Sequence, residues 1–283
     1  MRGAPVMRCT LELDRRKALL AMKLLGDHLA HIAITGASSG IGAALAEQYA
    51  SPKHLLSLLS RREASLETIA QRCKDNGASV DVQAGDVRDT DQIARWFLRI
   101  ERRQPVDVLI VNAGIFDGHG PDDALETPSE ARDLVNTNLL GAIYTAQAAL
   151  PHMMARRRGH IAFVSSLAAR LPCADAPAYS ASKAGLAAYA DALREFLFDH
   201  NVTVSTIYPG HVATAQTELH IGPLPLIISS MDAARKIRRA LDRGQTNIAF
   251  PRRAAWLVAA SQCLPWRLRA RTSRSTRFKV RKT

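Results

Sequence analysis

The 283-residue sequence contains no apolar run long enough for a multi-spanning membrane protein. Its four cysteines, Cys9, Cys73, Cys173 and Cys263, lie far apart, without the paired spacing of a zinc site or a redox couple. Each is interpreted most simply as a small buried apolar residue in a reduced, cytoplasmic setting. There is no His/Cys/Asp cluster that predicts a metal, and no internal repeat divides the chain.

Acidic residues are missing from the end of the chain. Residues 252–283 hold ten arginines and lysines and no Asp or Glu, so they carry +10 of the formal net charge of +12. Residues 1–251 carry the remaining +2, and the basic character therefore belongs to a tail. The apolar fraction of 47% can fill a substantial core, and the length fits one large α/β domain.

From residue 28 onward, short runs rich in Leu and β-branched residues alternate with helical patterns. The predicted strands span 28–35, 54–59, 80–83, 106–111, 160–165, 202–208 and 247–250. The predicted helices span 41–49, 63–74, 90–101, 130–156, 176–200 and 232–242. Continuously apolar strands predict a parallel sheet buried on both faces, which crossover helices must cover. The sequence thus predicts a single α/β domain over 28–250 with a doubly wound, Rossmann-like, seven-stranded parallel sheet.

A glycine-rich turn lies between the first predicted strand and the first predicted helix. Its residues are Thr35, Gly36, Ala37, Ser38, Ser39, Gly40, Ile41 and Gly42. Glycine permits the tight turn and the approach of the backbone to a pyrophosphate, while amides at the helix start face the anion. An ordinary surface turn is the alternative, but the strand–turn–helix context favours dinucleotide binding.

The end of the second predicted strand distinguishes between the two nicotinamide dinucleotides. An acidic residue there would bind the adenosine ribose diol and repel a 2′-phosphate, but this chain has Ser60, Arg61 and Arg62. A guanidinium binds a 2′-phosphate through parallel hydrogen bonds, so the pattern predicts NADP(H), with Arg61 favoured over Arg62. The alternative is that both arginines only solvate the start of the next helix.

Two later segments carry groups suited to proton transfer. Tyr179 and Lys183 lie four residues apart in a predicted helix, and an ammonium beside a phenol lowers a tyrosine pKa that starts near ~10. Such a tyrosine can protonate a developing alkoxide. Ser165 and Ser166 end a predicted strand at the sheet edge where open α/β sheets bind ligands. An amphipathic helix and a strand-end turn are the structural alternatives.

Together these segments resemble the short-chain dehydrogenase/reductase family. The glycine-rich turn matches its Thr-Gly-x-x-x-Gly-x-Gly motif, and residues 179–183 match its Tyr-x-x-x-Lys motif. The family's active-site serine lies thirteen residues before the tyrosine, which selects Ser166 over Ser165. The further matches are Asp86-Val87, Asn112-Ala113-Gly114, Asn138-Leu139-Leu140-Gly141 and Pro209-Gly210 followed by Thr214. The resemblance covers residues 28–250, with its motifs in the family's order.

The resemblance implies a role for each matching residue. Ser166 and Tyr179 are implied to bind the substrate oxygen, which Tyr179 protonates; Lys183 is implied to bind the nicotinamide ribose and help pass the proton, and Asn138 to hold a water. The residues implied to bind the cofactor are Gly36, Ser38, Ser39, Gly40, Ile41, Gly42, Arg61, Arg62, Asp86, Val87, Asn112, Ala113, Gly114, Tyr179, Lys183, Pro209, Gly210 and Thr214.

The expected activity is NADP(H)-dependent transfer of a hydride between nicotinamide and a carbonyl or secondary alcohol. No metal is required, and the family leads us to expect a homo-oligomer. A non-catalytic NADP(H)-binding sensor or scaffold is the alternative. The strongly apolar segment 221–228 favours a lipid-, acyl- or steroid-like substrate, although packing against the body or against another subunit explains it equally.

Two terminal regions remain outside the motifs. Residues 1–27 form an extension without an assigned function. Residues 11–25 could form a short helix, or the extension could be a disordered arm. It could also result from the choice of translation start, since Met22 would open a conventional chain. In the tail, 251–283, the apolar segment 254–264 is too short to span a bilayer. Its flanking arginines and tryptophans fit peripheral binding to anionic lipid, while a disordered solvated tail remains an equal alternative. Specific nucleic-acid binding is disfavoured because no recognition motif accompanies the charge.

Overall fold

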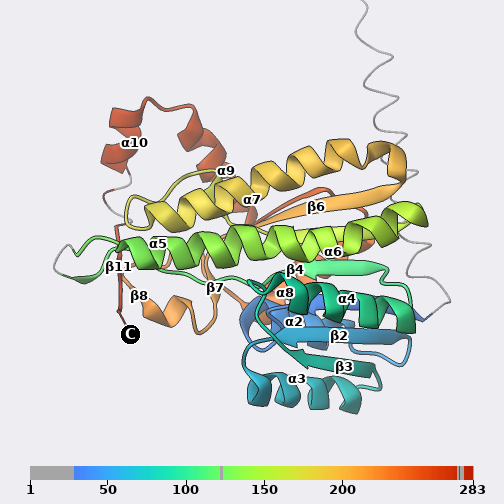
Figure 1. Cartoon of the computed structure of the whole chain (residues 1–283). Helices are drawn as coiled ribbons and strands as arrows, with labels where there is room; N and C mark the ends of the chain where they lie inside the picture. Colours follow the sequence, from blue (N-terminus) through green and yellow to red (C-terminus); the bar gives the residue numbers. More distant parts are fainter. Residues whose placement is uncertain (1–28, 122–123, 273, 275–276, 283) are drawn as a thin grey trace, which may run out of the picture.

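The structure, a computed structural model, describes residues 29–121, 124–272, 274 and 277–282. The predicted extension 1–27, with Cys9 and the three alternatives for its structure, therefore lies outside the described residues. The described chain forms one α/β domain in which helices lie on both sides of a parallel sheet (Figure 1).

The central sheet has seven strands in the order β10-β6-β5-β4-β1-β2-β3, and neighbouring strands run parallel. The strands are β1 (Ala30–Thr35), β2 (His54–Ser60), β3 (Ser79–Ala84), β4 (Val108–Val111), β5 (Gly159–Val164), β6 (Val202–Pro209) and β10 (Asn247–Phe250). The strand order reverses at β1, which pairs with both β2 and β4, and doubly wound sheets bind ligands at this point. The predicted doubly wound, seven-stranded parallel sheet is confirmed.

Two apolar cores cover the two faces of the sheet. In β1, Ile32 and Ile34 belong to one core and Ala33 to the other, because successive side chains of a strand face opposite sides. The helices on the first core are α2 (Gly40–Tyr49), α3 (Glu63–Asp75) and α8 (Ser230–Asp242). Those on the second are α4 (Thr90–Arg103), α6 (Gly141–Ala155) and α7 (Pro177–Phe196). These layers hold the carboxyl ends of the strands as a rigid platform for the site.

The helix predicted over 130–156 is broken by a π-helical turn, Asn136–Leu140, between α5 (Pro128–Val135) and α6. Apolar periodicity does not reveal such a turn, because the turn adds one residue to a helical repeat without changing the composition of the segment. The turn carries Asn138, whose side chain is completely buried. Single π-helical turns of this kind are frequent at functional sites.

The chain after β10 stays in contact with the domain. Its elements are α9 (Arg252–Gln262), α10 (Trp266–Thr272) and β11 (Lys279–Val280). In α9, Ala255 and Val258 pack on a cluster formed by Leu167 and Tyr208. β11 pairs antiparallel with the short strand β8 (His220–Ile221), while β7 (Val212–Ala213) pairs with β9 (Ile228–Ser229). The last strand of the sheet therefore ends at Phe250, and the described residues beyond it fold back onto the domain.

Candidate active site

The glycine-rich turn has a shape that only glycine accommodates at two of its positions. Gly36 and Gly40 adopt φ values of +68° and +55°, in the left-handed region that disfavours other residues. At Gly42, in the first turn of α2, an added Cβ would lie 2.3 Å from the carbonyl oxygen of Gly36. The turn leads directly into the start of α2, where the first amides of the helix and the helix dipole favour an anion.

A cavity of about 210 Å³ opens at this turn, beside the carboxyl ends of β1 and β2. Its lining brings together the predicted residues Gly36, Ser38, Ser39, Arg61, Arg62, Asp86, Val87, Asn112, Ala113 and Gly114. The lining residues that were not predicted are Leu59, Ser60, Gly85, Ile115 and Thr137. Gly40, Ile41 and Gly42 continue from the turn into the first turn of α2.

Thr137 is the most informative of the unpredicted lining residues. Its hydroxyl is buried, and among the described residues it has no hydrogen-bond partner. Buried hydroxyls almost always bond to something, so an unpaired one beside a cavity indicates a ligand group or a water there. Thr137 lies on the π-helical turn directly before Asn138, one residue ahead of the family match at 138–141.

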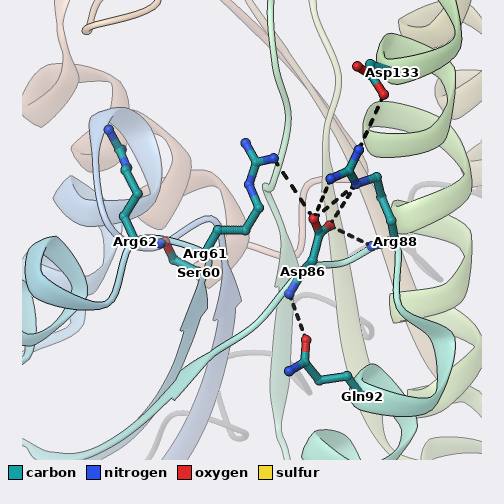
Figure 2. A network of polar contacts seen from close by, with 7 residues as sticks. All are labelled: Ser60, Arg61, Arg62, Asp86, Arg88, Gln92 and Asp133. Carbon is teal, nitrogen blue, oxygen red and sulfur yellow. Dashed lines mark hydrogen bonds and ion pairs between the residues drawn. The ribbon is translucent and has the colours of Figure 1, made fainter. Parts of the chain in front are cut away.

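The arginines after β2 hold two different positions around the cavity. The Arg62 guanidinium donates to the hydroxyls of Ser39, at 2.5 Å, and Ser38, at 3.3 Å, and so lies over the glycine-rich turn. Arg61 points the other way, with Nη1 4.0 Å from a carboxylate oxygen of Asp86, as Figure 2 shows. The two arginines thus flank the cavity from the turn and from the end of β3.

Asp86 is fixed by a third arginine, which the sequence analysis did not identify. Arg88 donates to both carboxylate oxygens of Asp86, with Nη2 at 2.8 Å, and also pairs with Asp133 on α5 (Figure 2). Burial acts to raise the Asp86 pKa, but the hydrogen bonds and the charges of Arg88 and Arg61 outweigh it and hold the pKa below its usual value. Asp86 is therefore an ionised, oriented acceptor at the cavity wall.

The two serines that follow β5 face different partners. Ser165 donates its hydroxyl to the backbone carbonyl of Lys183 at 2.9 Å and so fastens β5 to α7. Ser166 forms a hydrogen bond with Tyr179, and its hydroxyl also accepts from the amide of Ala168 at 3.1 Å. The structure thus brings Ser166 to the phenol and leaves Ser165 in a structural role, in agreement with the spacing argument.

The ionisation of Tyr179 differs from the sequence-based expectation. Burial raises its pKa to about 12, and the hydrogen bond from Ser166 opposes that rise only in part. Burial also lowers the pKa of Lys183 to about 8, and its ammonium donates to the carbonyl oxygen of Val164 at 3.0 Å. Lys183 Nζ lies 5.9 Å from the centre of the Tyr179 ring. The predicted lowering of the tyrosine pKa by Lys183 is therefore wrong for this state of the chain, because desolvation dominates.

The Asn138 side chain is held by hydrogen bonds to the loop after β4 and to α7. Its Oδ1 accepts from the amide of Ile115 at 2.8 Å, while Nδ2 donates to the Ile115 carbonyl at 3.0 Å and to Ser182 at 3.1 Å. A Cβ at Gly114 would lie 3.0 Å from that Oδ1 and 3.2 Å from Lys183 Nζ. The loop after β4, the π-helical turn and α7 therefore meet at one tightly packed point, which joins the cavity to the helix that carries Tyr179 and Lys183.

The loop after β6 closes the other side of the turn. Pro209 ends β6, and the amide of Gly210 donates to the carbonyl of Phe250 at 2.7 Å. Thr214 lies against the glycine-rich turn, with its methyl 2.9 Å from the position of a Cβ on Gly40. Beyond it, the apolar segment 221–228 is only partly covered, and Ile227 is 44% exposed.

Comparison with known proteins assigns the family. A sequence model described as short chain dehydrogenase matches residues 30–220. An uncharacterized oxidoreductase of Myxococcus xanthus is 32% identical over 234 residues, which are 82% of this chain and 91% of that protein. A 3-dehydrosphinganine reductase of Arabidopsis thaliana is 35% identical over 211 residues, covering 72% of this chain and 61% of the relative.

A solved structure agrees with these sequence matches. The short-chain dehydrogenase from Sphingobium yanoikuyae in complex with NADPH has a TM-score of 0.72 and 25% identity, and the match covers 83% of this chain and 94% of that chain. The glycine-rich turn, the cavity and the Ser166–Tyr179 pair thus occur in a chain that belongs, as its sequence resemblance implied, to the short-chain dehydrogenase/reductase family of oxidoreductases.

Proposed function

We propose that this chain is an NADPH-dependent carbonyl reductase, able to run in reverse on a secondary alcohol, that acts on an apolar substrate. The observation that carries the proposal is the placing of Tyr179 beside Ser166 and buried Lys183, whose Nζ lies 5.9 Å from the centre of the phenol ring and packs against Gly114 of the cavity lining. A sensor or scaffold that only binds a nucleotide has no use for such a set of proton-transferring groups.

The cavity fits the adenosine side of NADPH. The glycine-lined turn brings the start of α2 to the cavity, where the first amides of the helix can bind the pyrophosphate, and Asp86 is an ionised acceptor. Arg61 and Arg62 flank the cavity and supply guanidinium groups for a 2′-phosphate. The Sphingobium enzyme, which shares the fold, is in complex with NADPH. The remaining predicted contacts, at Pro209, Gly210 and Thr214, would border the nicotinamide.

Bound nicotinamide supplies the hydride that reduces the carbonyl carbon. The protein's own residues act on the oxygen: Ser166 and Tyr179 orient it by hydrogen bonding, and the Tyr179 hydroxyl donates its proton as negative charge develops. A phenol with a pKa of about 12 is fully protonated at neutral pH, which suits a donor. Lys183 would bind the nicotinamide ribose and help restore the proton. The water assigned to Asn138 stays a prediction.

The surroundings of Tyr179 support an apolar substrate. Phe116, Leu219 and Phe278 belong to or pack against the apolar cluster that contacts the tyrosine, and Phe116 meets its ring edge-on at 5.0 Å. The Arabidopsis relative is named as a reductase of 3-dehydrosphinganine. We therefore place the substrate among long-chain or ring-containing ketones, in which the carbonyl is the main polar group.

The test of this function is NADPH oxidation at 340 nm with purified full-length chain and a panel of ketones that runs from cyclohexanone to acyl and steroid ketones. We expect turnover that favours the apolar members and depends on NADPH over NADH. The proposal fails if no ketone is reduced, or if NADH supports the reaction as well as NADPH.

We further propose that α9 and α10 attach the enzyme to an anionic membrane surface. Trp256 and Trp266 are 75% and 67% exposed, and Arg252, Arg253 and Arg267 flank them. Exposed tryptophans among arginines are typical of interfacial segments, where each cation contributes about 1 kcal/mol. Both helices lie apart from β2 and β3 (Figure 1). In the described part of the chain no helix could span a bilayer.

Sedimentation with phosphatidylglycerol vesicles tests this attachment. We expect binding of the parent chain, a loss of at least tenfold in Trp256→Ala/Trp266→Ala, and no loss in Phe196→Ala, which removes an aromatic side chain of α7 that is 61% exposed. Equal binding by all three would overturn the attachment. The cytoplasmic location and the homo-oligomer stay predictions.

A further inference from the structure

The segment Arg277–Lys282, which we call the strap, packs beside Tyr179. The amide of Val280 donates to the carbonyl of His119 at 2.8 Å, and the amide of Arg281 donates to that of Leu219 at 2.7 Å. Through β11 the strap also pairs with β8. It therefore ties the loop after β4 to the loop after β6, and both loops border the catalytic tyrosine.

A buried carboxylate fastens the start of the strap. Asp175 is 1% exposed and lies four residues before Tyr179. Arg277 Nε is 2.7 Å from each Asp175 oxygen, and its Nη2 is 2.6 Å from Oδ1. The amide of Phe278 adds a bond at 3.1 Å. Multiple charge-assisted bonds of this kind fix a segment in one geometry.

A second ionic group fastens the end of the strap. Lys282 Nζ lies 2.9 Å from a carboxylate oxygen of Asp117 and 2.8 Å from one of Glu130, and it donates to the Gly118 carbonyl at 2.7 Å. Two acidic residues therefore share one lysine at the start of α5. Of the basic tail, at least Arg277 and Lys282 thus pair with the body of the same chain.

Glycines leave the room that the strap occupies. A Cβ on Gly222, which has φ of +142°, would lie 3.1 Å from Cβ of Phe278. A Cβ on Gly118 would lie 3.1 Å from a methyl of Val280 and 2.4 Å from the Asp175 carbonyl oxygen. The two loops are thus shaped to receive the strap, and the contact is not a loose surface association.

The strap inserts Phe278 into the surroundings of Tyr179. Phe278 is 8% exposed, stacks on His220 with ring centres 4.3 Å apart, and lies 6.1 Å from Phe116. Phe116 in turn contacts Tyr179, which packs against the same cluster. A ketone that reaches the phenol from this side must share the space with the Phe278 ring.

We propose that the strap is the outer wall of the substrate site and that Phe278 limits the bulk of the ketone that reaches Tyr179. The proposal rests on the proposed reductase function, which it deepens by naming a specificity-determining residue. The last residues of the chain then select the substrate, although they lie about a hundred positions from the catalytic helix in sequence.

The first test compares kcat/KM for a bulky steroid or diaryl ketone with kcat/KM for cyclohexanone. We expect Phe278→Ala to raise the bulky-to-small ratio at least tenfold while the NADPH dissociation constant stays within twofold. Phe196→Ala, on the exposed surface of α7, should leave the ratio unchanged. A ratio within twofold of the parent in Phe278→Ala would overturn the assignment.

The second test needs no substrate, because Cys173 packs against the cluster that contains Phe278 and Val280. With N-ethylmaleimide and peptide mass spectrometry, we expect Cys173 to react at least tenfold faster in Arg277→Ala than in the parent. Exposed Cys263 is the internal reference, and Arg281→Ala, on the same strap, is the matched control. Phe278→Ala is the second variant if Arg277→Ala does not give the parent's circular dichroism spectrum.

The two tests separate the two proposals. An unchanged Cys173 rate in the folded variants would show that the strap does not cover the site, whatever the activity. If the parent reduces no ketone, the reductase function fails, and the cysteine rates still decide whether the strap closes the space beside Tyr179.

Discussion

Around the cavity beside β1 and β2, the site offers backbone amides, hydroxyls and guanidinium groups, and it opens to solvent at Arg61 and Arg62. Around Tyr179 it offers phenylalanine, alanine and valine side chains, closed by ion pairs at Asp175 and Lys282. The first half suits a charged molecule and the second an apolar one. In the proposed function, the first region is the nucleotide half of the site and the second is the substrate half, and different loops complete the two halves of one sheet edge.

The two halves also differ in how the chain encodes them. The nucleotide half comes from short contiguous motifs, each following its own strand. The substrate half joins residues far apart, such as Phe116 with Phe278 and Asp175 with Arg277. Variation in the second half can therefore change the substrate without disturbing the first half.

The largest effect on catalysis is expected when Tyr179, in the substrate half, loses its hydroxyl group. Tyr179→Phe should lower kcat at least a thousandfold, or about 4 kcal/mol in barrier, because no other described group is placed to protonate the substrate oxygen beside Ser166. The measurement is steady-state NADPH oxidation with the best ketone of the panel. Tyr189→Phe, on the same helix, is the matched control and should keep kcat within twofold. A Tyr179→Phe rate above a tenth of the parent's would contradict the mechanism.

The next largest effect, on NADPH binding, is expected when a methyl group is added to Gly42 in the nucleotide half. Gly42→Ala places a Cβ 2.3 Å from the Gly36 carbonyl oxygen, so the turn must deform. We expect the NADPH dissociation constant to rise at least a hundredfold, about 3 kcal/mol, in a fluorescence titration. Gly185→Ala in α7 meets only the flexible Leu139 side chain at 3.1 Å and should change it less than threefold. Equal effects of the two variants would show that the turn does not cradle the cofactor.

The arginines should discriminate between the two dinucleotides by a smaller factor. Removal of both, in Arg61→Ala/Arg62→Ala, should weaken NADPH about 10- to 100-fold, or about 1.4 to 3 kcal/mol, and NADH less than threefold. Arg72→Ala removes a comparably exposed arginine on α3 and serves as control. Titration of both dinucleotides checks the prediction, and equal losses for NADPH and NADH would refute the role of the arginines.

The sequence predicts the residues of the nucleotide half more completely than those of the substrate half. All seven strands of the sheet, the glycine-rich turn and the pair Ser166 and Tyr179 follow from periodicity, local spacing and family resemblance. Thr137 was missed because the family match begins at its neighbour Asn138, although both residues lie on the same π-helical turn. Arg88 was missed although it lies two residues after Asp86, a spacing that could have identified it.

The strap could not be predicted from local patterns. A run of basic residues is most simply a solvated or surface-binding tail, since its partners lie elsewhere in the sequence. Arg277 finds its partner at Asp175, and Lys282 finds its partners at Asp117 and Glu130. Only the folded chain brings these charges together. The direction of the Tyr179 pKa was wrong for a related reason, because burial depends on the whole fold.

The smallest effect concerns stability. Burial lowers the pKa of Lys183 from 10.5 to about 8, so the folded state holds this charge at a cost. Lys183→Met removes this cost but also loses the hydrogen bond to the Val164 carbonyl. We expect the net result to be a free energy of unfolding about 1 to 3 kcal/mol higher than that of the parent at pH 7. The variant should have no activity. Urea unfolding provides the measurement. An equal or lower stability of Lys183→Met at pH 7 would contradict this prediction.

The pH dependence of this effect has a defined sign. Between about pH 8 and 10.5 the unfolded chain binds a proton at residue 183 that the folded chain has lost, so the parent gains stability as pH rises through this window. Lys183→Met lacks that gain, so the difference in free energy of unfolding between the variant and the parent should shrink as the pH rises. A difference that grows from pH 7 to pH 9.5 would show that Lys183 is not held at a cost.

The most direct test of the division into two halves is a double-mutant cycle on NADPH affinity. The dissociation constant is measured by fluorescence for the parent, Tyr179→Phe, Arg61→Ala/Arg62→Ala and the combined variant. If one half binds the nucleotide and the other converts the substrate, the arginine effect should be the same with and without the tyrosine, to within about 0.5 kcal/mol. A coupling energy above about 1 kcal/mol would contradict separate halves and require a site that works as one unit.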